Sequence, residues 1–437
     1  MRGGGGTSLP GKTLVRLRAD AVAQLAQRLP EGCVIVSATN GKTTTAALAA
    51  SVLERSGIEL VHNSAGANME GGIASTLLQG SGAQLGLFEI DEAWVPQLTA
   101  SLQPKLMLLG NLFRDQLDRY GELEAIAERW AQTLGAGGPG EHSQLLLNAD
   151  DPLIADLGRQ RERTLHFGIE DDSVALQSMA HAADAKRCRR CGAAYVFDAV
   201  YLGHLGRYHC PACGQRRPQP QITASEIELR GVESASFTLQ TPEGNARVQL
   251  SLPGLYNVYN ALGAAALGFA LGVPTQQIAE SLSVTQAAFG RAELVELSGR
   301  PLKILLVKNP AGANEVLRTL ALQPGQHDLL CVLNDRIADG RDVSWVWDAD
   351  FEMLAQRVRR VTCSGSRAPE MALRLKYAGV DPQSIVVIEQ LPAALDAAIA
   401  DAPQSRLPLY ALPTYTAMLD LRSLLLSRGV TGERWSA

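Results

Sequence analysis

The sequence predicts an α/β protein with two parallel sheets and a small cysteine-bearing insertion in its first half. Short apolar segments alternate with helical patterns over residues 30–170, and the alternation starts again near residue 300. Strands that are apolar throughout are typical of parallel sheets covered by helices on both faces. Residues 176–220 interrupt this pattern, because they are polar, rich in arginine and contain two Cys-x2-Cys pairs.

The composition is that of a globular protein with two or three domains. The chain has 437 residues, of which 46% are hydrophobic and 19% charged, and this is ample apolar material for a core. Its 40 basic and 45 acidic residues give a net charge of −5, so the charge balance gives no support to general binding of nucleic acid or anionic membranes. No segment approaches eighteen consecutive apolar residues, and no apolar signal core is present. We therefore expect a cytoplasmic protein without a transmembrane anchor.

The first half contains the elements of a parallel sheet. Residues 13–29 have apolar positions at helical spacing and predict one amphipathic helix. Residues 33–38, CVIVSA, predict a buried strand, and the helix that follows extends to Gly57. Further buried strands are expected from Leu85, Pro104 and Gln144.

The second half changes pattern twice. Residues 222–250 predict alternating strands, and residues 258–272 predict an Ala-rich helix. A second α/β series then begins, with buried strands expected at 303–307, 328–334, 360–365 and 384–389. We therefore expect one domain over residues 1–294, with an insertion at about 183–220, and a smaller domain over residues 295–437.

Two segments match a phosphate-binding loop, and the poorer match has the better context. Residues 6–13, GTSLPGKT, fit the G-x-x-x-x-G-K-[ST] pattern in full, whereas residues 36–43, VSATNGKT, lack its first glycine. The loop needs a strand before it and a helix after it, because the helix N-terminus and the turned N–H groups bind the anion. Only residues 36–43 have that context. We therefore place Lys42 at the β- and γ-phosphates and the Thr43 hydroxyl at Mg²⁺, the alternative being an ordinary strand-to-helix turn.

Two carboxylates come at the end of the next buried strand. Glu89 and Asp91 end the segment LGLFEID, and ligands of open α/β sheets lie at the carboxyl ends of strands. A carboxylate there can hold Mg²⁺ directly or through water, although a solvated strand end fits the spacing equally well.

Four clustered cysteines predict a structural zinc site. Cys188, Cys191, Cys210 and Cys213 have the spacing C-x2-C-x18-C-x2-C, which is typical of a zinc ribbon. Four thiolates leave no open position on the metal, and the alternatives are a redox pair or free thiols. Five nearby arginines are expected on a solvated rim and not in a phosphate or nucleic-acid site, namely Arg187, Arg189, Arg190, Arg216 and Arg217.

Several segments resemble the Mur ligases and folylpolyglutamate synthases. They are ATNGKTTT from Ala38, LPGLYNVYNALGAAA from Leu252 and FGRAE from Phe289. Longer segments, among them NSAGANMEGGIAS, LVKNPAGANEVL and ADGRDVSWVWDADFE, resemble the MurT family more specifically, over nearly the whole chain. The resemblance implies a Mur-ligase central P-loop ATPase domain with an inserted four-cysteine zinc ribbon, followed by a smaller Rossmann-like α/β domain.

The resemblance also implies a reaction. MurT-type proteins are the Mur-ligase-like subunits of lipid II isoglutaminyl synthase. With ATP and Mg²⁺ they convert the D-glutamate α-carboxylate of the lipid II stem peptide to D-isoglutamine through an acyl phosphate, using ammonia from a GatD-type glutaminase. The implied enzyme works in the cytoplasm at the inner face of the membrane. Residue by residue, the resemblance places nucleotide or magnesium at Thr39, Asn40, Gly41, Lys42, Thr43, Thr44, Glu89, Asn257, Asn260 and Arg291.

The sequence departs from ordinary Mur ligases in three ways. Gln116 stands where their motif has a metal-contacting histidine, and only Asn309 and Pro310 remain of their D-Y-A-H-N-P segment. The residues before the phosphate loop also leave no room for the domain that holds a UDP-linked sugar, which suits a lipid-linked substrate better.

An acidic segment with two tryptophans follows a strand of the second series. Residues 334–352 read NDRIADGRDVSWVWDADFE and predict a loop, and composition alone favours a surface loop with anchored tryptophans. The resemblance implies that an aspartate here orients the catalytic histidine of the partner glutaminase. Asp348 is the first candidate and Asp350 the second. Tryptophans in a docking loop also suit an interface.

Two other functions compete with this one. A stand-alone Mur or folylpolyglutamate-type ligase would join an amino acid in place of ammonia, and it predicts an intact D-Y-A-H-N-P segment. A nucleotide-regulated zinc-ribbon protein acting on nucleic acid predicts a surplus of basic residues. The sequence has neither feature.

Overall fold

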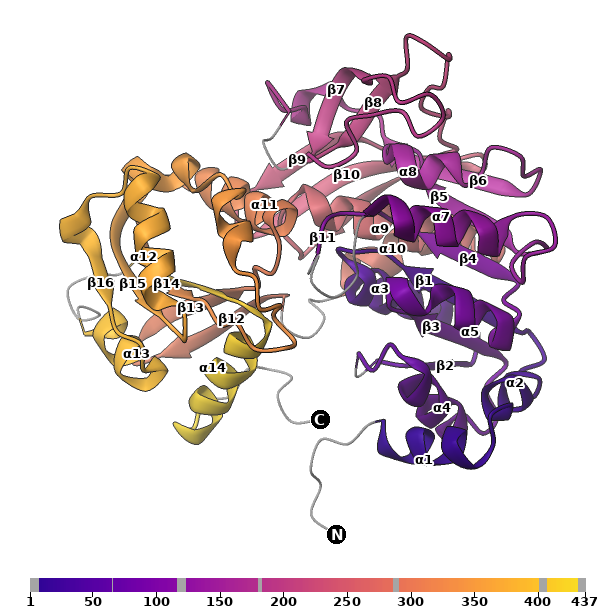
Figure 1. Ribbon diagram of the computed structural model, residues 1–437, viewed down its shortest axis with the longest axis horizontal. Helices are drawn as coiled ribbons and strands as arrows, with labels where there is room; N and C mark the ends of the chain where they lie inside the picture. The colour runs from indigo at the N-terminus through magenta and orange to yellow at the C-terminus, as the bar shows by residue number, and fades with distance from the viewer. Residues whose placement is uncertain are drawn as a thin grey trace.

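Two sheets dominate the fold, which is seen here in a computed structural model (Figure 1). The structure describes residues 8–64, 66–115, 123–179, 183–285, 291–400 and 407–430, without the side chains of residues 291–293. Within these residues, no helix is both long enough and apolar enough to cross a membrane.

The larger sheet has nine strands within the described residues. They are β1 (Cys33–Ser37), β2 (Leu60–His62), β3 (Leu85–Glu89), β4 (Leu106–Leu109), β5 (Gln144–Asn148), β6 (Thr164–Ile169), β9 (Ile222–Arg230), β10 (Ser234–Thr241) and β11 (Gly244–Leu250). Their order is β11-β10-β9-β6-β5-β4-β1-β3-β2. Pairing is parallel from β2 to β9 and antiparallel from β9 to β11. The predicted parallel sheet is confirmed, and the alternating strands extend it.

Helices cover both faces of this sheet, which explains why its strands are apolar throughout. In β1, Val34 and Val36 pack into one core, and Cys33 and Ile35 pack into the other. The first core is closed by α3 (Lys42–Arg55), α9 (Leu255–Ala270) and α10 (Thr275–Val284). The second core is closed by α2 (Ala21–Ala26), α4 (Glu70–Gln79), α5 (Val95–Leu102), α7 (Leu123–Leu134) and α8 (Pro152–Asp156).

The single helix predicted over residues 13–29 is wrong, because the segment forms two helices. The first is α1 (Leu9–Leu17), which ends where Arg18 becomes extended, and α2 begins after Asp20. The break lets α1 pack closely on α4, where the Gly11 N–H donates to Ser75 Oγ at 2.8 Å. It also lets α2 bury its own apolar residues in the core of the larger sheet, so tertiary packing overrides the helical periodicity.

The smaller sheet has six strands within the described residues. They are β12 (Arg291–Leu297), β13 (Arg300–Leu305), β14 (His327–Val332), β15 (Val358–Ser364), β16 (Ile385–Val387) and β17 (Leu409–Pro413). Their order is β12-β13-β17-β14-β15-β16, and all pairs except β12–β13 are parallel. The four predicted strands are confirmed as β13 to β16, whereas β12 and β17 were not predicted.

Helices cover both faces of the smaller sheet too, as expected of a Rossmann-like fold. One core contains residues of α11 (Pro310–Ala321) and α12 (Ala368–Tyr377), and the other contains residues of α13 (Leu391–Ile399) and α14 (Tyr415–Ser427). The acidic segment forms two short 3-10 helices, η3 (Ser344–Trp347) and η4 (Phe351–Arg357). The cysteine-bearing insertion forms a separate hairpin of β7 (Val196–Leu202) and β8 (Leu205–His209), at the top of Figure 1.

Candidate active site

The loop between β1 and α3 has the strand–loop–helix geometry that a phosphate site needs. Gly41 has a φ of 88° and precedes the first turn of α3, and a Cβ added there would lie 1.9 Å from Asn260 Oδ1. The N–H groups of Thr39 and Asn40 donate to the backbone and side-chain oxygens of Asn111, both at 2.9 Å, so the loop is fixed to the end of β4. This loop follows β1, an interior strand of the sheet with β4 and β3 on either side.

The other match to the loop pattern lies in a helix. Lys12 and Thr13 are exposed residues within α1, and Gly6 lies outside the described residues. Residues 9–13 of this match therefore belong to a helix and not to a loop between a strand and a helix.

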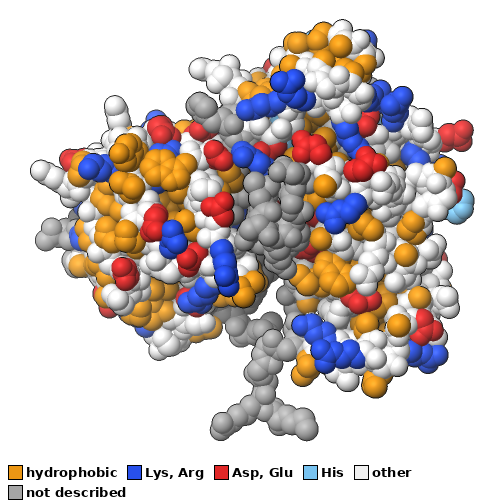
Figure 2. All heavy atoms as spheres, viewed as in Figure 1, with side chains coloured by type: hydrophobic (Ala, Val, Ile, Leu, Met, Phe, Trp, Pro, Cys, Tyr) orange, Lys and Arg blue, Asp and Glu red, His pale blue; other side chains and the backbone are white. Residues whose placement is uncertain are grey.

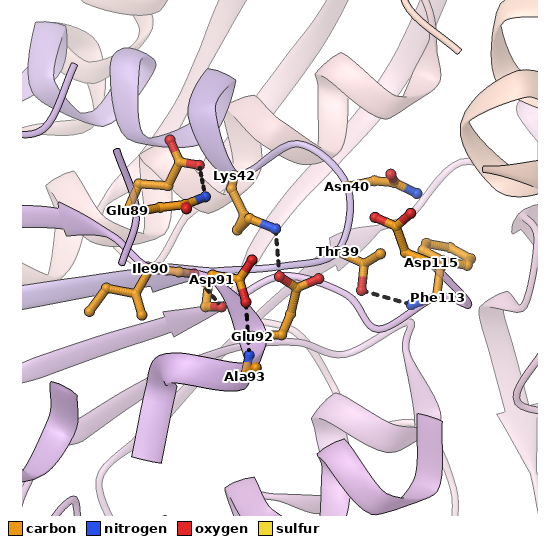
Figure 3. A network of polar contacts seen from close by, with 12 residues as sticks. Thr39, Asn40, Lys42, Glu89, Ile90, Asp91, Glu92, Ala93, Phe113 and Asp115 are labelled. Carbon is orange, nitrogen blue, oxygen red and sulfur yellow. Dashed lines mark hydrogen bonds and ion pairs between the residues drawn. The ribbon is translucent and has the colours of Figure 1, made fainter. Parts of the chain in front are cut away.

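Lys42 forms a buried ion pair with Glu92, a residue that the sequence analysis did not single out. Lys42 Nζ donates to Glu92 Oε2 at 2.6 Å, and both side chains are at most 10% exposed (Figure 3). Burial lowers the pKa of the Lys42 ammonium, but Glu92 outweighs it, and the pKa lies above its ordinary value. Burial raises the pKa of the Glu92 carboxyl, but Lys42 and Lys308 hold it below its ordinary value. The pair is therefore charged, and Glu92 keeps the ammonium in place beside the loop.

Glu89 and Asp91 lie on the same edge of the sheet but have different partners. Glu89 ends β3, is 3% exposed and accepts a hydrogen bond from Asn68 Nδ2 at 3.2 Å. Asp91 accepts from the Ala93 N–H and caps the 3-10 helix η1 (Glu92–Trp94). Figure 3 shows Glu89, Asp91 and Glu92 around Lys42. The described residues contain no group of three carboxylates close enough together to hold a metal, so Mg²⁺ would need phosphate oxygens and water beside Glu89 and Thr43.

A segment that begins the second α/β unit contacts the phosphate loop directly. Lys308 Nζ donates to Asp115 Oδ2 at 2.6 Å and to Thr39 O at 3.2 Å. Burial raises the pKa of the Asp115 carboxyl, and Lys308 opposes the rise without cancelling it. The side-chain amides of Asn309 and Asn40 donate to each other, at 2.9 and 3.3 Å. Two cations, Lys42 and Lys308, therefore lie close to the loop.

The other residues that were predicted to contact the nucleotide differ in their distance from the loop and in their burial. Asn260 lies beside Gly41, accepts from Thr45 Oγ1 and donates to Asn257 Oδ1, which links α9 to the loop. Asn257 donates to Pro253 O and is 1% exposed, so it supports Asn260. Thr43 is half-buried and Thr44 fully buried in the first turn of α3. The side chain of Arg291 and all of Gln116 lie outside the described residues.

The two candidate aspartates differ sharply in their surroundings. Asp348 is 47% exposed and lies 3.4 Å from Arg114 Nη1. It lines a cavity together with Lys308 and Asn309. Asp350 accepts from Asn314 Nδ2 at 2.9 Å, and its N–H donates to Asn314 Oδ1 at 2.7 Å, so its carboxylate is engaged in holding η4 against α11.

The four cysteines form a site that fits a metal. All four Sγ atoms lie within 4.8 Å of one another, and these residues are the one such group among the described residues. Gly192 and Gly214 have φ values of 75° and 74° and follow the second cysteine of each pair, which allows the backbone to turn around the thiolates. Tetrahedral zinc with Zn–S bonds of about 2.3 Å fits this spacing, so the predicted four-cysteine site is geometrically sound.

The prediction of a solvated arginine rim holds for the exposed Arg187, Arg190 and Arg216 but is wrong for Arg217. Arg217 is 7% exposed on its side chain, and it binds Asp150 at 2.5 Å and Glu170 at 2.6 Å. Asp150 is fully buried, and it also accepts from Tyr259 and from the Ile169 N–H. Arg189 pairs with Glu128 and Arg190 with Asp156. The insertion is therefore attached to the larger sheet by charged contacts.

Replacing Cys210 by serine is expected to remove the metal and destabilise the insertion. Among the described residues, the small core of the insertion consists of buried Cys188, Tyr195, Tyr208 and Cys210 with Ala193 and Phe197 packed against them, so we expect it to depend on a metal for stability. We expect about one zinc per chain in the wild type and almost none in Cys210→Ser, as measured by elemental analysis, with a lower melting temperature. The control Cys331→Ala alters a buried cysteine of β14 and should keep its zinc. A metal-free wild-type preparation with unchanged melting temperature would contradict this expectation.

Comparison with known proteins decides the family. The model for the Mur ligase middle domain matches residues 36–209, and that for the MurT ligase C-terminal domain matches residues 306–418. The chain is 32% identical to the lipid II isoglutaminyl synthase (glutamine-hydrolyzing) subunit MurT of Streptococcus pneumoniae (strain ATCC BAA-255 / R6), over 98% of this chain and 94% of that protein. The same subunit of Staphylococcus aureus (strain N315) is 33% identical, over 87% and 85%. The chain belongs to the MurT family. It is thus an ATP-dependent ligase of the Mur type.

Solved structures agree with the fold of this MurT-family chain. A pseudomurein peptide ligase type C from Methanothermus fervidus superposes with a TM-score of 0.71 at 21% identity, over 93% of this chain and 80% of that one. MurF ligase from Thermotoga maritima, in a complex with ADP, gives 0.64 at 15% identity, over 96% and 84%. The Mur-ligase fold predicted from the sequence is therefore confirmed.

Proposed function

We propose that this chain is the synthetase subunit of a lipid II isoglutaminyl synthase. It would use ATP to amidate the D-glutamate α-carboxylate of the lipid II stem peptide, with ammonia from a GatD-type glutaminase. The observation that carries the proposal is the contact of Lys308 and Asn309 with the phosphate loop. It brings a cation from each half of the chain to one phosphate site, as transfer of a γ-phosphoryl group requires.

The residues of the chain supply positioning and charge for this reaction. The substrate carboxylate forms a bond to the γ-phosphorus as the bond to the leaving ADP oxygen breaks. Ammonia then attacks the acyl carbon, inorganic phosphate leaves, and the nitrogen loses a proton. Lys42 and Lys308 neutralise the phosphates, and Gly41 lets the backbone approach them. Mg²⁺, held through Glu89, Thr43 and phosphate oxygens, would add further positive charge.

We assign the orienting role toward the partner's histidine to Asp348. The assignment is supported by its exposure and by the engagement of Asp350 with Asn314. Trp347 and Tyr377 are 48% and 71% exposed, and their rings pack 5.7 Å apart beside Asp348. Hydrophobic side chains gather around α12 on the left-hand body of Figure 2, which suits a partner surface. A glutaminase seated there would release ammonia next to the cavity that Asp348 shares with Lys308.

The rest of the assignment follows from the same proposal. The ATP-binding domain would span residues 1–294, with the zinc ribbon inserted at about 183–220, and the C-terminal domain would span residues 295–437. Lipid II would bring the enzyme to the inner face of the membrane, and the ribbon would hold structural Zn²⁺.

The nitrogen source provides the test of this function. The purified chain with ATP, Mg²⁺ and lipid II is expected to form amidated product from ammonia, and to use glutamine only when a GatD-type glutaminase is added. Mass spectrometry of the stem peptide gives the readout. Incorporation of an amino acid in place of ammonia would favour a stand-alone ligase, and amidation from glutamine by the chain alone would refute the two-subunit arrangement.

A further inference from the structure

A cavity leads from the phosphate loop toward the middle of α11. It begins at Asn40, Gly41 and Lys308 and reaches Glu315 and Val316. Its walls are mainly apolar and aromatic between these ends. They are formed by Phe113, Leu202, Leu205, Tyr256 and Tyr259. Such walls suit a flat heterocyclic ring better than a sugar or a peptide.

Glu315 is the acidic residue in the lining of this cavity, and one of its carboxyl oxygens has no hydrogen-bond partner among the described residues. The residue is 5% exposed, and its Oε2 has no hydrogen-bond partner among the described residues. Its Oε1 lies 3.9 Å from Arg318 Nη1, which is beyond hydrogen-bond distance. The guanidinium of Arg318 instead donates to the carbonyls of Tyr201 and Val174. Buried polar atoms are normally paired, so this carboxyl group points to a missing ligand.

The protonation of Glu315 limits what that ligand can be. Burial raises the pKa of its carboxyl to about 7, and Arg318 opposes the rise only in part. The neutral carboxyl group donates through its O–H and accepts through its carbonyl oxygen. It therefore matches a ligand edge that presents one acceptor beside one donor.

We infer that Glu315 recognises the adenine base of the nucleotide through hydrogen bonds. Its O–H donates to N1 of adenine, and its carbonyl oxygen accepts from the 6-amino group, while the phosphates lie at Gly41 and Lys42. The inference rests on the proposed nucleotide site and adds a specificity-determining residue from α11, far in sequence from the phosphate loop. The apolar tip of the inserted hairpin, Leu202 and Leu205, then forms one wall of the base pocket.

Equilibrium binding of two nucleotides separates base reading from a structural role. Titration calorimetry compares ADP with purine riboside 5′-diphosphate, which lacks the 6-amino group. The wild type should prefer ADP by about tenfold. Glu315→Leu should weaken ADP binding by more than that factor, because it also loses the hydrogen bond to N1, and it should abolish the preference. Glu315→Gln, whose amide also has one donor and one acceptor side by side, should keep both. The matched control Glu280→Gln, at an exposed glutamate of α10, should behave as the wild type.

The possible failures can be told apart. A wild type that binds ADP without preferring it over purine riboside diphosphate would overturn the inference alone. Equal weakening of both nucleotides by Glu315→Leu, or no weakening, would overturn it too. A wild type that binds neither nucleotide would overturn the proposed function together with the inference. Glu315→Leu removes a buried carboxyl without a hydrogen bond, so its melting temperature should not fall.

Discussion

Replacing Lys42 by alanine should reduce the rate of ATP-dependent amidation by at least about 10²–10³-fold, because removing one group that stabilises the negative charge of a transition state lowers turnover by about that factor. Lys42 is the buried cation at the start of α3, and its ammonium already lies beside the loop because Glu92 holds it there. Initial rates of phosphate release with ammonia and lipid II measure the effect. Lys12→Ala, at the other lysine of a phosphate-loop pattern, should retain nearly all activity, because Lys12 is exposed on α1.

The Lys42 variant needs a stability control, because it leaves Glu92 without its cation. Glu92 is 6% exposed, and removing one partner of a buried ion pair costs about 3–5 kcal/mol. The double variant Lys42→Ala/Glu92→Gln should recover the melting temperature without recovering turnover. Restored turnover in the double variant would show that Lys42 acts only on stability. Equal losses of activity in Lys12→Ala and Lys42→Ala would contradict the choice of residues 36–43 as the phosphate loop.

Replacing Asp348 by asparagine should abolish the use of glutamine by the complex while ammonia still supports amidation. An asparagine cannot stabilise the charged histidine of the partner, and a comparable change in other triads lowers turnover by about 10⁴-fold. The exposed pair of Asp348 with Arg114 contributes little to folding, so the melting temperature should stay unchanged. Parallel assays of the complex with glutamine and with ammonium chloride measure the split.

Two neighbouring aspartates sharpen this experiment. Asp342→Asn alters an exposed carboxylate that accepts from the Ser344 N–H, and it should leave both nitrogen sources in use. A selective loss of glutamine use in Asp350→Asn, with Asp348→Asn unaffected, would move the orienting role to Asp350. Loss of both nitrogen sources in Asp348→Asn would mean that this residue belongs to the synthetase site itself.

Local sequence patterns predicted the parts of the site that are built from neighbouring residues. The strand–loop–helix geometry around Gly41 followed from a buried strand, a glycine and a helix that are adjacent in the sequence, and the cluster of four thiols followed from two Cys-x2-Cys pairs. Both features depend on short-range geometry, because a helix N-terminus and a knuckle turn are specified by the residues that form them. The overall α/β class was predictable for the same reason, since each strand and helix has its own period.

The charge pairs of the site were not predictable, because they join residues that are far apart in sequence. Lys308 meets Asp115 across 193 positions, and Asn309 meets Asn40 across 269. One signal was present in the segment LVKNPAG, where a lysine precedes the retained Asn-Pro pair. Glu92 was equally visible beside Glu89 and Asp91, but only the turn into η1 shows that its carboxylate, and not theirs, contacts Lys42.

The contact between Arg217 and Asp150 couples the stability of the cysteine-bearing insertion to that of the larger sheet. If residues 183–220 were deleted and the ends rejoined, the Asp150 carboxyl would lose Arg217 and keep the hydrogen bonds from Tyr259 and the Ile169 N–H. Removing one partner of a buried ion pair destabilises a protein by about 3–5 kcal/mol, which is a large part of the free energy of unfolding of a typical domain. A related ligase without the insertion would therefore need another partner for the acid at this position, or a different residue there.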